Sequence, residues 1–226
     1  MDKKSKTKRT FALSATVLTL FTLFAVSAAV FTLVATGVIT IGQEAVAQQS
    51  GGTIKGKVNS PWVSRYPAMV YVDKVPGQFP APKQNPHMGQ KGLVFDPHVM
   101  GVLEGSTVDF TNDDTVAHNV SSPPGSAKVF NLGLYGVGVT KTVTFDKLGE
   151  VPLLCSVHPE MSAFVLVLQN PYFALTDKSG NFEIKDVPPG SYQLKAWDEK
   201  LKEVSQGVVV ESGKTATVEF KDLQKR

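Results

Sequence analysis

The sequence has few of the residues on which enzymes and disulfide-stabilised domains depend. It contains one cysteine and four histidines in 226 residues. A single cysteine excludes an intrachain disulfide framework. The chain also shows no glycine-rich phosphate loop after a strand and no Ser/His/Asp order beyond chance. These absences argue against an enzyme.

Most of the chain also has no excess of positive or negative charge. The sequence has 23 Lys and Arg against 20 Asp and Glu. Five of the basic and two of the acidic residues lie within residues 1–47, so 18 of each remain in the rest. A neutral chain carries no basic footprint for a nucleic-acid partner. The positive net charge is therefore a property of the N-terminus alone.

The N-terminus has the pattern of an export signal. Residues 3–9 carry five basic side chains, and residues 11–41 form an uncharged, mostly apolar run. The run is ample for a spanning helix of about 20 residues and long for a signal-peptide core of about 7–15. Small residues at 45–47 form a good cleavage site. Residues 1–47 are predicted to be either a signal peptide or a helical membrane anchor, with the rest periplasmic or otherwise extracytoplasmic.

The remaining chain has the pattern of an all-β protein. Short alternating segments are separated by Gly, Pro, Asn and Asp, and no convincing helical period is found. The predicted strands are Thr53–Val58, Ala68–Val75, Gly101–Leu103, Thr107–Thr111, Lys141–Asp146, Val151–Cys155, Ala163–Gln169, Asn181–Lys185, Ser191–Asp198, Glu203–Val210 and Thr215–Phe220.

A candidate metal site occurs at residues 155–161, where the only cysteine begins a C-x-x-H-x-x-M pattern. Taken alone, Cys155 would be a small buried hydrophobic residue. A thiolate, an imidazole and a thioether within seven residues instead favour copper, with His118 arriving from a distant strand. Zinc is the rival metal, but structural zinc prefers closed Cys/His sets, to which a thioether adds little.

These residues resemble the cupredoxins. Residues 155–161 are similar to their ligand loop in the short, amicyanin-like C-x-x-H-P-x-M form, and residues 104–114 resemble the strand and loop before the first histidine ligand. The resemblance covers about residues 83–170 and implies a Greek-key β-sandwich. It implies one type 1 copper ion, held by His118, Cys155, His158 and Met161.

The resemblance has two further consequences. It implies that Asn119 lies behind the ligands and ties the two ligand loops together. It also shows a departure, because cupredoxins often carry an aromatic residue two positions before the cysteine, where this chain has Leu153.

Residues 175–226 resemble a carboxypeptidase regulatory-like, or transthyretin-like, β-sandwich. The resemblance depends on two tight turns, at 178–181 and 188–191. About four strands are too few to cover a core. Two strands in residues 48–80 could complete this sandwich, with the copper domain at 81–174 inserted into it or packed against it. The alternative is that these front strands belong to the cupredoxin sheet.

Several other polar residues have ordinary explanations. His87 and His98 are expected to be solvated rather than ligands. Asp113 and Asp114 are expected to form a loop. Residues 197–199 are interpreted as a strand end, with a core tryptophan and two solvated carboxylates.

The function expected from this pattern is electron transport. Four histidines are too few for the additional copper centre of copper oxidases and nitrite reductases. The chain is therefore predicted to be an exported blue copper protein that carries single electrons between envelope redox partners. The alternative is a copper-binding or copper-delivery module that docks to an envelope partner without redox turnover. A third hypothesis is an adhesion or scaffold protein with a vestigial site.

Overall fold

The computed structural model describes residues 50–221 and 223–226. Within these ranges, sixteen strands form four sheets and no α-helix occurs, which confirms the all-β prediction for this part of the chain. No helix long and apolar enough to cross a membrane is found among the described residues. The helix predicted within residues 11–41 and the cleavage site at 45–47 lie outside them.

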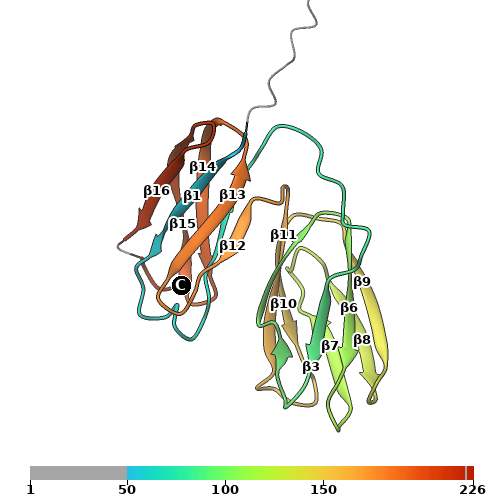
Figure 1. Ribbon diagram of the computed structural model, residues 1–226. Coiled ribbons are helices and arrows are strands. Elements are labelled where there is room, and N and C mark those ends of the chain that lie inside the picture. The colour runs from blue at the N-terminus through green and yellow to red at the C-terminus, as the bar shows by residue number, and fades with distance from the viewer. Residues whose placement is uncertain (1–49, 222) are drawn as a thin grey trace, which may run out of the picture. The chain divides into compact units, whose positions relative to one another are not determined.

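The first sandwich consists of a five-stranded and a four-stranded sheet around one hydrophobic core (Figure 1). In sheet order, the five-stranded sheet contains β5 (Val99–Leu103), β11 (Ser162–Leu168), β10 (Gly149–Leu154), β7 (His118–Ser122) and β8 (Phe130–Tyr135). The four-stranded sheet contains β4 (Phe95–Asp96), β3 (His87–Gln90), β6 (Ser106–Asn112) and β9 (Thr140–Phe145).

Strand β6 shows why this sandwich forms. Its residues alternate between buried and partly exposed positions, as the period of two in a strand requires. Val108 and Phe110 point into the core and are fully buried. On the outer face, the hydroxyls of Thr107 and Thr111 bond across to threonines of β9, at 2.8 Å in both cases. The alternation thus gives β6 one buried face and one partly exposed face.

The second sandwich has a three-stranded and a four-stranded sheet around a separate core. In sheet order, the three-stranded sheet contains β13 (Asn181–Val187), β1 (Gly52–Val58) and β16 (Thr215–Phe220). The four-stranded sheet contains β12 (Phe173–Leu175), β2 (Met69–Val72), β14 (Gly190–Asp198) and β15 (Leu201–Val210).

The two front strands pair with strands from the end of the chain. Strand β1 is antiparallel to β13 and parallel to β16, and β2 lies between β12 and β14. Figure 1 shows the blue β1 beside the orange β13 and the red β16. The chain therefore leaves the second sandwich after β2, forms the first sandwich, and returns at β12.

The turn before β13 is one of the two that the sequence indicates. Gly180 has φ +85°, and a Cβ there would lie 2.3 Å from the carbonyl oxygen of Val58. Only glycine fits this position without strain. The carboxylate of Asp177 accepts the backbone N–H groups of Ser179 and Asn181, each at 2.8 Å, which closes the turn.

Strand β11 contributes to two cores. Ala163, Val165 and Val167 belong to the core of the first sandwich. Residues on the opposite face pack with Trp197 of β14, whose ring centroid lies 5.2 Å from that of Phe164. Burial of both faces explains why β11 is a nearly continuous apolar run.

The strand end at residues 197–199 differs from its prediction. Trp197 is buried as expected, and its Nε1–H donates to Glu150 at 2.9 Å. The two following carboxylates are not solvated, however. Asp198 is buried, which raises its pKa, and Glu199 lies 2.7 Å from His98 Nε2. The prediction was wrong because a short segment does not show which of its side chains become buried.

Candidate metal centre

The first residue of the candidate centre is His118, at the start of β7. Its side chain is fully buried. The preceding loop, residues 113–117, is held by Asn112, whose Nδ2 donates to the carbonyls of Val116 at 2.8 Å and Tyr135 at 3.1 Å. The loop thus delivers His118 to the strand in a fixed orientation.

The second and third residues come from the loop between β10 and β11. Cys155 directly follows β10 and is 4% exposed. His158 is partly exposed. The loop is closed by the backbone N–H of Met161, which donates to the carbonyl of His158 at 3.0 Å. A short closed loop restricts the positions available to both side chains.

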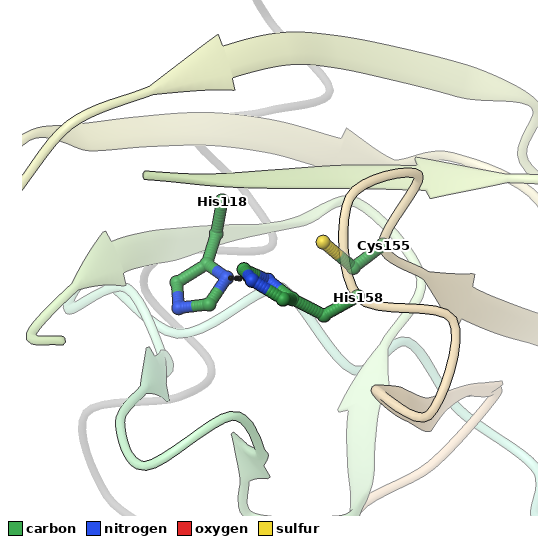
Figure 2. A group of neighbouring side chains, drawn as sticks. All are labelled: His118, Cys155 and His158. Carbon is green, nitrogen blue, oxygen red and sulfur yellow. Dashed lines mark hydrogen bonds between the residues drawn. The ribbon is translucent and has the colours of Figure 1, made fainter. Parts of the chain in front are cut away.

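The three side chains converge on one point (Figure 2). Nδ1 of His118 lies 3.0 Å from Nδ1 of His158. The ligand atoms of His118, Cys155 and His158 all lie within 4.8 Å of one another. Two imidazole nitrogens and a sulfur at this separation form a donor set for a soft or borderline metal ion such as copper. These residues therefore fit the metal that the sequence pattern indicates.

The far nitrogen of His118 has a partner of its own. Nε2 lies 3.0 Å from Oδ2 of Asp114, four residues earlier. The backbone N–H groups of Leu93 and Thr115 also donate to this carboxylate, at 2.9 and 2.8 Å. These two donors and then His118 hold the pKa of Asp114 well below its usual range.

Asn119 connects the strand of His118 to the cysteine loop. Its Oδ1 accepts the backbone N–H of Ser156 at 3.3 Å, and its Nδ2 donates to Asn131 at 2.8 Å. The side chain is 2% exposed. A buried amide bonded at both ends holds the two segments in register.

Met161 stands at the end of the loop, directly before β11. It is 1% exposed and lies in the same core cluster as Cys155. The structure thus places its thioether in the apolar interior next to the loop.

A buried tyrosine lies behind the centre. Tyr135 pairs with His118 across β7 and β8, and its hydroxyl interacts with Gln90 of β3. Burial raises the pKa of Tyr135 to about 12; the hydrogen bond with Gln90 opposes this rise, and the nearby Cys155 adds a smaller one. The phenol therefore stays neutral at physiological pH.

The other two histidines lie outside the converging group. His98 faces Glu199 at 2.7 Å, and His87 lies 4.0 Å from Asp113. The contact between Asp114 and His118 was missed, because Asp113 and Asp114 were interpreted only as a loop. The sequence signal for this contact is that Asp114, an acidic residue, lies four positions before the candidate ligand His118.

Comparison with known families gives two matches. Residues 83–168 match the model of the copper binding proteins of the plastocyanin/azurin family. Residues 158–218 match domain II of polysaccharide lyase family 4, an fn3-like model. The first match contains all three converging residues. The second supports a further β-sandwich domain, while its transthyretin-like character stays a prediction. No curated protein matches the chain.

Solved structures resemble parts of the chain. A purple cupredoxin from Nitrosopumilus maritimus is 26% identical, with 37% of this chain and 99% of that chain covered and a TM-score of 0.34. The copper-containing nitrite reductase from Thermus scotoductus SA-01 is 25% identical over 44% of this chain and 25% of its own, with a TM-score of 0.37. An amicyanin variant in its oxidized state is 22% identical over 37% and 81%, with a TM-score of 0.35. TM-scores this low add nothing to the family match.

Proposed function

We propose that this protein is an exported type 1 copper protein that carries single electrons between redox partners of the cell envelope and catalyses no reaction of its own. One observation carries the proposal: the ligand atoms of His118, His158 and Cys155 all lie within 4.8 Å of one another. The family match over residues 83–168 supports copper as the metal.

The ligand set favours copper over zinc. His118, Cys155 and His158 supply two imidazoles and one thiolate, and Met161 offers a buried thioether at the end of the same loop. Two histidines and a cysteine with a weak axial methionine are typical of blue copper sites. Copper bound to such a set supplies a one-electron couple between Cu(I) and Cu(II).

The chain itself provides rigidity and access. His118, Cys155 and Met161 are buried, so the protein excludes water from most of the centre. Hydrogen bonds on the ligand loops hold the side chains in place before any metal arrives, and little rearrangement is then needed when the charge changes. His158 is partly exposed, so its ring offers a short route for an electron to a docked partner.

Export is proposed from the N-terminus. Basic residues at 3–9 precede the apolar run at 11–41, which would serve as a signal or as a membrane attachment. Ligation of Cys155 by a metal would also protect the single thiol in an oxidising compartment.

The test is copper reconstitution of the full chain, followed by visible and paramagnetic-resonance spectra and repeated redox cycles. We expect stoichiometric copper and an intense thiolate-to-copper band that bleaches on reduction and returns on oxidation. The His118→Ala variant should lose the band or let added imidazole bind. The matched control His98→Ala should keep the band, because His98 bonds to Glu199 outside the centre.

Other outcomes would decide against the proposal. Stoichiometric copper without a reversible band would favour a copper-delivery module. A protein that takes up no stoichiometric copper would be a scaffold with a vestigial site.

A further inference from the structure

The side chain of Asp114 is fixed from three directions. Its Oδ2 lies 3.0 Å from Nε2 of His118 and accepts the backbone N–H of Leu93 at 2.9 Å. Its Oδ1 accepts the backbone N–H of Thr115 at 2.8 Å. The Asp114 side chain is 11% exposed and that of His118 is fully buried, so the contact between them is largely shielded from water.

The surrounding backbone is arranged to make these contacts. The amide oxygen of Asn112, which is fully buried, accepts the backbone N–H of Asp114 at 3.0 Å. Leu93 adopts φ 60°, a left-handed conformation that is unfavourable for a residue with a side chain. Such a conformation persists only where the surroundings fix it. Here, the strained residue is one of the two backbone donors to Asp114.

The carboxylate determines which nitrogen of His118 can bind a metal. A neutral imidazole carries one hydrogen, and a carboxylate can only accept a hydrogen bond. The hydrogen of His118 therefore resides on Nε2, and Nδ1 keeps a lone pair. Nδ1 faces the centre, 3.0 Å from Nδ1 of His158.

We propose that Asp114 is a positioning residue of the metal centre. By accepting the Nε2–H of His118, it fixes the tautomer and ring orientation that turn Nδ1 toward the ligand set. Its negative charge also makes that nitrogen a stronger donor to Cu(II) than a neutral partner would. The inference rests on the proposed function, because it assigns the residue that tunes the same centre.

A purely structural role for Asp114 would have different consequences. The contacts to Leu93 and Thr115 alone would make the carboxylate a loop-stabilising group. Its removal would then change the stability of the protein and leave metal affinity, reduction potential and the tautomer of His118 as they are.

The experiment compares three variants of the full chain with the wild type. Asp114→Ala removes the acceptor. Asp114→Asn keeps an oxygen acceptor but removes the charge. Asp113→Asn is the matched control, because it removes the same charge one residue away, where the side chain is 46% exposed and lies 4.0 Å from His87 rather than near His118.

Copper affinity and reduction potential are measured first. We expect Asp114→Ala to weaken Cu(II) binding by roughly 10–100-fold, as is typical when a partner behind a metal ligand is lost. The reduction potential should rise, since Cu(II) depends on the lost negative charge more than Cu(I) does. Asp114→Asn should fall between the wild type and Asp114→Ala, and Asp113→Asn should match the wild type.

The tautomer of His118 is then measured by nitrogen-15 NMR of the copper-free protein, at a pH where both imidazoles are neutral. We expect Nε2–H in the wild type and a mixture of tautomers in Asp114→Ala. If Asp114→Ala does not fold, the potential and affinity of Asp114→Asn decide, with Asp113→Asn as the reference.

A folded Asp114→Ala with wild-type affinity, potential and tautomer would overturn the assignment. A wild-type protein that binds no copper would instead reject the proposed function. In that case, the NMR measurement still decides: Nε2–H lost on removal of the carboxylate supports a positioning role, and an unchanged tautomer refutes it.

Discussion

The two sandwiches bury very different side chains. The described part of the first sandwich buries six uncharged polar or histidine side chains, namely Gln90, Ser106, Asn112, His118, Asn119 and Ser122. The second sandwich and the segment that leads into it bury three polar side chains, namely Asn170, Thr176 and Asp198. An unpaired buried polar group costs about 1–3 kcal/mol, so most buried polar groups have hydrogen-bond partners. In the first sandwich, His118 belongs to the candidate centre, and Asn112 and Asn119 hold its two loops in place.

The two cores therefore contribute differently to the protein. The second sandwich is stabilised by an almost wholly apolar core. The first sandwich has an apolar core of similar size, yet at the end near Cys155 it replaces apolar contacts with hydrogen bonds. Substitutions at the end of the first sandwich near Cys155 should therefore alter the metal centre. Substitutions in the second sandwich, or where the two sandwiches touch, should alter only the stability of the protein.

The strongest test of this distinction is Cys155→Ser. We expect the visible band to disappear completely, because only the thiolate supplies it. The fold should survive, with the free energy of unfolding of the copper-free protein lowered by about 1–3 kcal/mol for a buried hydroxyl. Absorption spectra and thermal unfolding measure the two effects. The neighbouring Ser156→Ala is the control, because its hydrogen bond to Asn119 uses the backbone N–H and is kept. An undiminished band in Cys155→Ser would reject Cys155 as a ligand.

An intermediate effect is expected for Gly101→Ala, at the contact between the sandwiches. A Cβ there would lie 2.7 Å from Cε2 of Phe173 and 3.1 Å from Cε of Met69, both in the second sandwich. Overpacking of this kind typically costs about 1–3 kcal/mol. Chemical denaturation measures the loss, and the visible band should not change, since the ligand side chains are untouched.

The matched control for this variant is Gly207→Ala in β15, where the nearest atom to a new Cβ is Nε2 of Gln193, at 3.9 Å. This substitution should be neutral or stabilise by about 0.4–1 kcal/mol, because it restricts the unfolded chain. Equal destabilisation by both variants would show that the contact at Gly101 is not tightly packed.

The smallest effect on binding is expected for Met161→Leu. The axial bond of a blue copper site is long and weak, so the variant should still bind copper and stay coloured. Its reduction potential should rise, because a leucine gives Cu(II) no donor. Redox titration measures the shift, and the swap should cost less than about 1.5 kcal/mol in stability.

Met88→Leu is the control for Met161→Leu, since Met88 is equally buried in the same core but lies on β3. An unchanged potential and spectrum in Met161→Leu would identify Met161 as core packing. A shift of the same size in both variants would mean that the potential responds to the core in general.

The sequence predicted strands best where alternation is undisturbed. Every predicted strand overlaps one in the structure, including β1, β14 and β16 of the second sandwich. The missed strands are β3, β4, β7, β8 and β12. Strand β7 begins with the buried polar residues His118 and Asn119, and therefore shows no apolar alternation. Polar residues that serve the site therefore remove the apolar alternation by which the strand would be recognised in the sequence.

Three of the candidate ligands could be predicted because they lie close together in the sequence. Cys155, His158 and Met161 lie within seven residues, and soft ligands at that spacing indicate copper whatever the surrounding fold. His118 was predicted as the second imidazole, but it lies on another strand, so no short segment shows that it meets the other ligands. Its distance of 3.0 Å from His158 is a property of the folded chain.

By itself, the sequence determined the all-β class of the described residues and the ligand types, because strand periodicity and the softness of a thiolate are properties of short segments. Tertiary structure decided which sheets the front strands join, since β1 finds its partners more than a hundred residues away. It also decided that Asp114 faces His118 and that Asp198 and Glu199 are buried. The physical reason is that hydrogen bonding and burial depend on what each side chain meets in space, and the pattern of a single segment does not contain that information.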